Sequence, residues 1–182
     1  KFLGQQCLFD SLDQYLQLAQ AKQHDNTVLI DQLLYLNRAS VPIRAVLEQQ
    51  AEPLKPCHID PTAANFLYQI RSHNQRRWYL LDWEYSAMCE PIWDLSDLAA
   101  EADFNSDQEV LLLESYYSQQ IPAWHSRLIL YRATLDLLAA AWAVSQLSDD
   151  LNDHYIRQRM TRVENLLASN ELGHHLDLQG KL

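Results

Sequence analysis

Apolar residues recur every three or four positions along most of this chain, which is the spacing that places them on one face of an α-helix. Phe9, Leu12 and Leu16 start this pattern. It predicts helices over residues 9–22, around Leu29, Leu33 and Leu36, and from Ser40 to before Pro53. It also predicts a helix after Pro91 with Leu95, Leu98 and Ala102 facing inward, another from Ser106, and long helices over 123–146 and 152–168.

Polar residues mark where several of these helices begin and end. Asp25, Asn26 and Thr27 are candidates to cap the second helix. The run Ser106-Asp107-Gln108-Glu109 has the form of a capping box opening the next helix. We expect the last helix to end before Gly173, which leaves His174-His175-Leu176-Asp177 as a polar tail without a metal.

One segment departs from the helical pattern. Leu54-Lys55-Pro56 breaks any helix, and residues 66–70 and 78–81 read as two strands joined by a polar turn over 72–77. The apolar end of the second strand leads directly into Asp82, so we expect a buried strand that ends in a carboxylate. The sequence therefore predicts a single domain that is mainly α with a small β-hairpin.

Charge and cysteine content narrow the class of protein. The 182 residues carry a net charge of −10, which argues against a nucleic-acid partner because phosphates require a basic surface. The same charge would steer a cationic substrate, or it is simply a solvated acidic surface. No apolar run approaches the roughly 20 residues of a membrane span. Cys7, Cys57 and Cys89 are too few for a disulfide framework, which favours the cytoplasm, and adjacent Cys57 and His58 lack the spacing of a zinc site.

Candidate chemistry is concentrated in two short motifs. His58, Asp60 and Asn65 form His-x-Asp-x4-Asn, and Asp82 with Glu84 forms Asp-x-Glu after the predicted hairpin. This is the order in which kinase-like phosphotransferases place a catalytic base and magnesium ligands. Asp60 suits the base, and Asn65 and Asp82 supply hard oxygen ligands. An Asp and an Asn in a loop also act simply as turn formers, which is the alternative for the first motif.

These motifs resemble the choline kinase branch of the aminoglycoside phosphotransferase-like kinases, within the protein-kinase-like superfamily. The similarity is closest to bacterial choline kinases of lipopolysaccharide decoration, and thiamine kinases are near relatives. The similar segments are CHIDPTAANFLY (57–68), LLDWEYSAMCEPIWDLSDLAAEADF (80–104), ESYYSQQIP (114–122) and LDLLAAAWAVSQ (135–146). They cover most of residues 54–170.

The resemblance implies roles for the motif residues. Asp60 would be the catalytic base and His58 would brace its loop. Asn65 and Asp82 would hold Mg²⁺, and Glu84 is a weaker candidate for the same metal site. ATP would be the phosphoryl donor.

It also implies where the acceptor binds. Glu101 falls where choline kinases place an acidic residue that faces the substrate cation. Trp142 matches one tryptophan of a Trp-x-x-Trp pair, although its partner position is Ala139 here and Trp142 could instead be core. Other aromatic residues that could line the pocket are Tyr85, Trp93 and Phe104.

Half of a kinase is absent from the sequence. The three glycines are too far apart to form a phosphate-covering loop, and none of the four lysines lies in a strand-like run. We therefore expect the carboxy-terminal lobe of a protein-kinase-like fold, with a catalytic loop over 56–66, a hairpin over 66–83 and substrate helices over 92–170. Its missing partner would be the amino-terminal lobe of the same kinase, without which this lobe would be inactive.

The resulting hypothesis is the catalytic and acceptor-binding lobe of an ATP- and Mg²⁺-dependent kinase. Its substrate would be choline or a similar small cationic amino alcohol. Thiamine or aminoglycoside kinases remain alternatives, because Asp60, Asn65 and Asp82 do not report the acceptor. A binding module that holds a cation without transferring phosphate, and a helical scaffold in which these residues only form turns, are alternatives of other classes.

Overall fold

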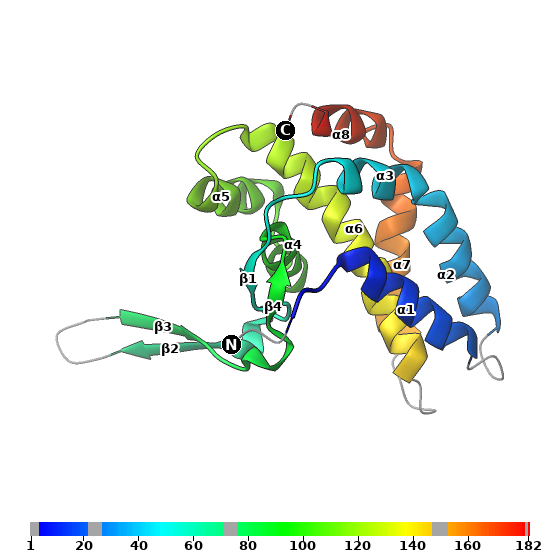
Figure 1. Ribbon diagram of the computed structural model, residues 1–182, viewed down its shortest axis with the longest axis horizontal. Coiled ribbons are helices and arrows are strands. Elements are labelled where there is room, and N and C mark those ends of the chain that lie inside the picture. The colour runs from blue at the N-terminus through cyan, green and yellow to red at the C-terminus, as the bar shows by residue number, and fades with distance from the viewer. Residues whose placement is uncertain (1–3, 22–26, 71–75, 147–152, 181) are drawn as a thin grey trace.

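The computed structural model describes residues 4–21, 27–70, 76–146, 153–180 and 182, and it is mainly helical with a small β-hairpin, as predicted (Figure 1). The described helices are α1 (Leu8–Ala21), α2 (Thr27–Ala39), α3 (Val41–Gln49), α4 (Ile92–Glu101), α5 (Ser106–Tyr116), α6 (Ile121–Gln146), α7 (Asp153–Ala168) and α8 (Leu172–Gln179). The strands are β1 (Lys55–Cys57), β2 (Phe66–Ile70), β3 (Arg76–Leu80) and β4 (Ala87–Cys89). The predicted caps Asp25 and Asn26, residue Asn152 and most of the turn at 72–77 lie outside the described residues.

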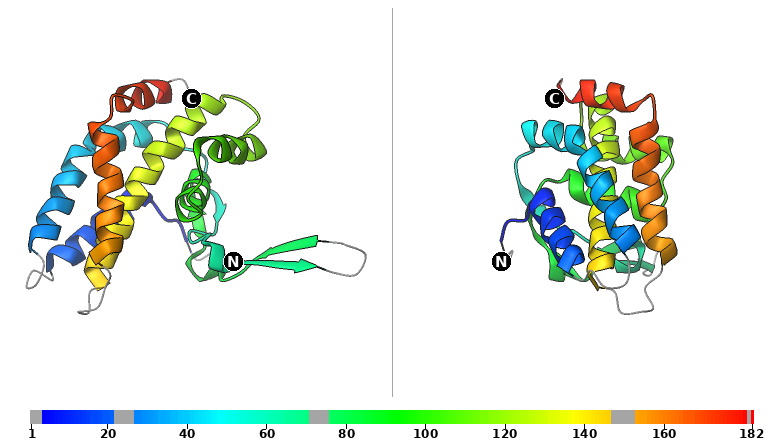
Figure 2. Two further views of the ribbon diagram at one scale, coloured as in Figure 1. Left: turned by 180° about the vertical axis from the view of Figure 1, so that it is seen from behind. Right: turned by 90° about the vertical axis from the view of Figure 1, so that its right-hand side faces the viewer.

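Helix α6 is the axis of the domain and contacts every other described helix. Its carboxy-terminal half packs with α1, α2 and α7, as Figure 2 shows, around Leu33, Ala140 and Val163. Its amino-terminal half packs with α3, α4 and α5 around Leu113 and Leu128. Each of the buried leucine and valine side chains contributes roughly 1.5–3 kcal/mol by leaving water.

The length and composition of α6 would allow it to cross a membrane, although charged residues break its sequence into shorter apolar runs. The apolar sequence is interrupted by Arg127, Arg132 and Asp136, but the mean hydropathy of an 18-residue window of the helix is still apolar. Because 72% of that window is buried inside the fold, α6 has the composition of a core helix.

The four strands form two separate antiparallel pairs. The hairpin β2–β3 was predicted, and it pairs Phe66 with Leu80. The pairing of β1 with β4 was not predicted, because each strand has three residues and β1 contains Pro56. The β1–β4 pair joins residues 55–57 to 87–89, so it closes the segment that carries both chemical motifs.

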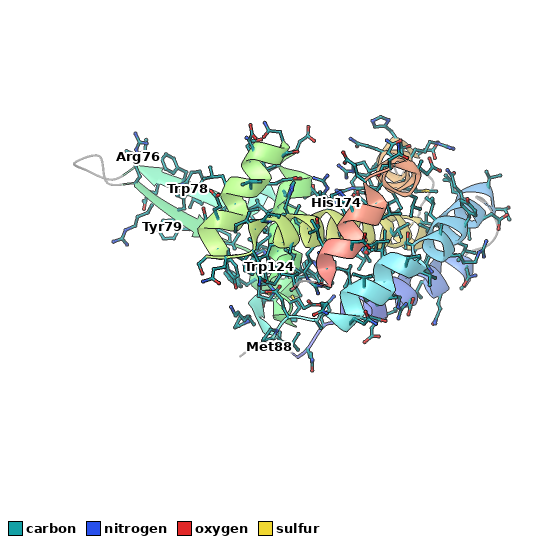
Figure 3. The ribbon with its side chains drawn as sticks, turned by 90° about the horizontal axis from the view of Figure 1, so that it is seen from above. Arg76, Trp78, Tyr79, Met88, Trp124 and His174 are labelled. Atoms are coloured by element: carbon teal, nitrogen blue, oxygen red, sulfur yellow. The ribbon has the colours of Figure 1, made fainter. Side chains whose placement is uncertain are left out.

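The expectation of a buried strand before Asp82 was wrong. Figure 1 shows the hairpin projecting away from the helices, and Arg76, Trp78 and Tyr79 lie at that end of the molecule in Figure 3. The side chains of Trp78 and Leu81 are exposed by 67% and 46%. The apolar run at 80–81 therefore marks the end of an exposed hairpin, which no described element covers.

The inward face of α4 also differs from the predicted one. Leu95 and Leu98 are only partly buried and Ala102 is exposed, beyond the last helical residue. Instead, the buried residues include Ser96 and Ala99, whose small side chains let α4 approach α6 closely.

Two predicted helix ends are shifted. The capping box of α5 begins one residue earlier, because Asn105 caps the amide of Gln108 and the side chain of Gln108 accepts the amide of Asn105. The expected polar tail at His174–Asp177 is part of α8, in which His175 is 8% exposed and its Nδ1 lies 3.0 Å from Ser126 Oγ. A buried contact with α6 thus extends the fold past Gly173.

The shift of the capping box leaves Glu109 free to join α5 to α6. Its carboxylate is 3% exposed and bonds His125 Nε2 at 2.8 Å and Arg132 Nη1. Burial alone would raise the pKa of Glu109, but the hydrogen bond from His125 and the charge of Arg132 outweigh burial and lower it.

We expect Glu109→Gln to destabilise the fold by roughly 3–5 kcal/mol near pH 7, because it leaves Arg132 without its buried partner. A lowered pKa stabilises the fold above the unfolded-state pKa, and this contribution is lost as pH falls through the folded-state value. The difference from the unmodified protein should therefore shrink in urea unfolding curves recorded below about pH 4. Glu114→Gln, on the exposed face of the same helix, is the matched control and should have little effect; equal losses for both would contradict this role.

Candidate active site

The loop between β1 and β2 is held by one carboxylate from α4. Asp94 Oδ2 accepts the backbone N–H of His58 at 2.7 Å, and Asp94 Oδ1 accepts that of Ile59 at 2.8 Å. Burial raises the pKa of Asp94, although these two bonds favour its charged form. The sequence alone did not single out Asp94, whose only signal was an acidic side chain in the first turn of a predicted helix.

The ring of His58 links the two chemical motifs. It is fully buried, its Nε2 lies 2.7 Å from the carbonyl oxygen of Leu81, and its Nδ1 accepts the backbone N–H of Asp60 at 3.3 Å. Because a carbonyl can only accept, Nε2 carries the proton. The His58 ring thus contacts the backbone of both Asp60, in the first motif, and Leu81, directly before Asp82 in the second.

Two residues of the site have an unusual backbone. Ile59 has φ of 74° and Asp82 has φ of 61°, in the left-handed region that β-branched residues in particular avoid. Such conformations cost of order 1–3 kcal/mol each and persist only where the surroundings hold them. The hydrogen bonds with Asp94 and His58 supply that restraint. Glycine is the usual sequence sign of a left-handed backbone, and neither position is a glycine.

Asn65 orients Asp60. Its Nδ2 donates to the backbone oxygen of Asp60 at 2.9 Å and to Asp60 Oδ2 at 3.0 Å. Since both partners accept, the amide nitrogen must face them, and Oδ1 of Asn65 points elsewhere. The backbone oxygen of Asn65 also accepts the N–H of Leu81 at 2.8 Å, which brings the chain beside Asp82.

The donor set here fits magnesium better than a tightly caged metal. Within the described residues, no group of three His, Cys, Asp or Glu side chains could hold an ion. Asn65 Oδ1 and the exposed carboxylate of Asp82 are hard oxygen donors on adjoining segments that could hold such an ion. Mg²⁺ commonly binds to one or two such ligands and completes its coordination with water and phosphate. Glu84 lines a second hollow, together with Gln5, Asp10 and neighbouring residues near the start of α1.

A cleft of about 350 Å³ opens beside Asp60. Of the predicted acceptor residues, Glu101, Trp142, Tyr85 and Trp93 line it. Trp142 is 43% exposed, which excludes the alternative that it is core. Phe104 is not brought to the cleft, because it packs in the hydrophobic cluster around Leu113.

The two carboxylates of α4 in this cleft have different environments. Glu101 bonds Arg159, which also bonds the buried Asp136 at 2.9 Å. Asp97, one turn earlier, also lines the cleft, although the sequence alone did not single it out. Burial, reinforced by the charge of Glu101, raises the pKa of Asp97 to about 8. Its spacing of four residues from Glu101 was the available signal.

Comparison with known proteins shows what the chain is similar to. No family model matches it. It is 30% identical over 96 residues to Protein LicA of Haemophilus influenzae. Among solved structures, it resembles a choline/ethanolamine kinase family protein from Mesorhizobium loti, with 31% identity and a TM-score of 0.81 over all of this chain. It also resembles choline kinase LicA from Streptococcus pneumoniae, with 28% identity and a TM-score of 0.74 over 92% of this chain. LicA in complex with AMP gives a TM-score of 0.66 over the same share, at 28% identity.

The chain spans only part of these relatives. The match covers 34% of the Haemophilus protein, and the chain covers 60% of the Mesorhizobium chain, 57% of the Streptococcus chain and 56% of the chain in the AMP complex. Sequence and fold together make this chain choline/ethanolamine kinase-like, as the motifs predicted.

We expect Asp94→Ala to loosen the loop around Asp60, because two backbone N–H groups lose their acceptor. The cost should be roughly 1–3 kcal/mol per buried amide left unpaired. Amide hydrogen exchange should accelerate at His58 and Ile59, and urea unfolding should give the lost stability. Asp107→Ala removes an exposed carboxylate from the first turn of α5 and serves as control; unchanged exchange in the Asp94 variant would contradict the role assigned to that residue.

Proposed function

We propose that this choline/ethanolamine kinase-like chain is the catalytic and acceptor-binding lobe of a small-molecule kinase. It would transfer the γ-phosphoryl group of ATP to the hydroxyl of choline or a similar amino alcohol. The observation that carries the proposal is that Asp60, in its restrained loop, lines the same cleft as the carboxylates of α4 and the ring of Trp142. That cleft offers a base for the hydroxyl and a cation site a few bonds away.

Asp60 would act as the base. Its carboxylate would accept the proton of the acceptor hydroxyl as the hydroxyl oxygen bonds to the γ-phosphorus and the bond from that phosphorus to the β,γ-bridging oxygen breaks, which releases ADP. Asn65 holds Asp60 through its amide nitrogen and leaves Oδ1 for the metal. Asn65 and Asp82 would hold Mg²⁺, with Glu84 a weaker candidate, and the ion would neutralise charge on the phosphates when bound.

The aromatic rings favour a cationic acceptor. Trp142 and Tyr85 line the cleft and each can contribute roughly 0.5–2 kcal/mol by cation–π attraction. Ala139, where choline kinases carry a second tryptophan, also lines it. The smaller side chain leaves room for a bulkier or less methylated amine than choline.

The nucleotide would need a second lobe. The relatives named as kinases are longer than this chain, and the sequence has no glycine-rich loop. We therefore propose that the active enzyme includes an amino-terminal lobe and that the present chain alone does not catalyse phosphoryl transfer. We also propose that the enzyme acts in the cytoplasm. Choline is our first candidate, ahead of ethanolamine, and thiamine and an aminoglycoside are the other acceptors to screen.

In the enzyme with both lobes, we expect Asp60→Asn to lower kcat about 10²- to 10⁴-fold and to change the KM values little, because the base acts on the hydroxyl in the transition state. Asp82→Asn should additionally raise the Mg²⁺ concentration needed for half-maximal rate, because it removes a metal ligand. A coupled ADP-release assay with choline, ethanolamine, thiamine and an aminoglycoside measures both.

Asp103→Asn is the control for these substitutions. Asp103 is exposed and has φ of 52°, a conformation that asparagine tolerates well. Near-normal turnover in both the Asp60 and Asp82 variants would rule out the assigned roles. Turnover with none of the four acceptors would rule out the proposed reaction.

A further inference from the structure

The cleft contains a carboxylate without a partner. Trp93, Asp97 and Glu101 are spaced four residues apart on α4, and all three line the cleft. Glu101 bonds Arg159, whose other nitrogen bonds Asp136. Within the described part of the chain, Asp97 has no hydrogen bond or ion pair. Of these two carboxylates, Asp97 is therefore the one still open to a ligand cation.

The α6 side of the cleft offers no charge to compensate Asp97. Helix α6 contributes Leu135, Leu138, Ala139 and Trp142 to the cleft, none of which titrates. The charge of Asp97 is therefore costly in the empty cleft, because burying a carboxylate without a partner is unfavourable. A cation bound there would give the carboxylate of Asp97 a positively charged partner.

We propose that Asp97, rather than Glu101, recognises the positive charge of the acceptor and selects cationic over neutral alcohols. This inference rests on the proposed function, since it assigns the charge-selecting residue of the same cleft. The resemblance had assigned that role to Glu101, but the carboxylate of Glu101 is already paired with Arg159.

Proton uptake gives the proposal a specific signature. Burial and the charge of Glu101 raise the pKa of Asp97 to about 8, so its carboxyl is mostly protonated at pH 7 in the empty cleft. Binding of a quaternary ammonium to the carboxylate must then release this proton to solvent. The Kd should fall by up to about tenfold per pH unit as pH rises towards 8, and level off above it.

Several other titratable groups surround Asp97. Glu101 and Asp94 lie on α4 itself and Asp60 in the catalytic loop, and all three raise the pKa of Asp97. Helix α7 contributes Arg159 and Tyr155, and the remaining titratable side chains of the cleft are Tyr15 and Tyr85. The Asp97→Asn variant separates the titration of Asp97 from all of these.

The test is isothermal titration of the protein with choline and with 3,3-dimethyl-1-butanol, its neutral carbon isostere, from pH 6 to 9. Two buffers of different ionisation enthalpy at pH 7 report the protons released. The unmodified protein should prefer choline and release close to one proton per choline bound. Asp97→Asn should weaken choline binding on the order of tenfold or more, leave the isostere unaffected and abolish proton release.

Asp103→Asn, which removes one negative charge outside the cleft, should leave all three properties unchanged. The proton release of the unmodified protein is measured without any substitution, so the inference stays testable if the Asp97 variant folds poorly. Equal affinity for choline and its isostere, no proton release, or a larger loss of choline binding in Glu101→Gln than in Asp97→Asn would each overturn the role of Asp97. Phosphoryl transfer to choline, measured separately, would still support the proposed function in those cases, and its absence together with normal charge selection would overturn only the transfer step.

Discussion

The position of the site depends on the two hydrogen bonds that Asp94 accepts from His58 and Ile59. They fix the loop to the first turn of α4, and α4 in turn packs on the central helix α6. Through the His58 ring, the same anchor reaches the carbonyl of Leu81 and sets the backbone before Asp82. A single carboxylate thus relates the proposed base, the proposed metal ligands and the acceptor cleft, although these come from segments far apart in the sequence.

Helix packing determines the other half of the geometry. Arg159 joins α7 to both α4 and α6 through Glu101 and Asp136. Buried ion pairs of this kind contribute little net stability compared with apolar packing, but separating the partners leaves a buried charge uncompensated and is costly. Here this pairing keeps one acidic side chain of α4 occupied and the other open.

The sequence was sufficient to predict features that depend on local periodicity. The long helix α6, the buried positions Leu29, Leu33 and Leu36, and the hairpin at 66–80 follow from apolar spacing and turn residues, and the structure confirms them. It was insufficient where a distant partner decides. The β1–β4 pair, the buried His175 and the pairing of Glu101 with Arg159 each depend on contacts that no local pattern contains. Asp97 was missed for the same reason, because its significance lies in a partner that it does not have.

The left-handed residue Ile59 shows how the loop keeps its shape. A glycine there would adopt the same backbone angles without steric cost, but it would give the unfolded chain many more conformations and would remove a side chain that packs beside the core and lines the cleft. Isoleucine is strained in this conformation, but it restricts the backbone to fewer conformations than glycine would. Ile59 therefore helps to order the loop although it takes no part in the proposed chemistry. A substitution that relieves its strain would position Asp60 less well.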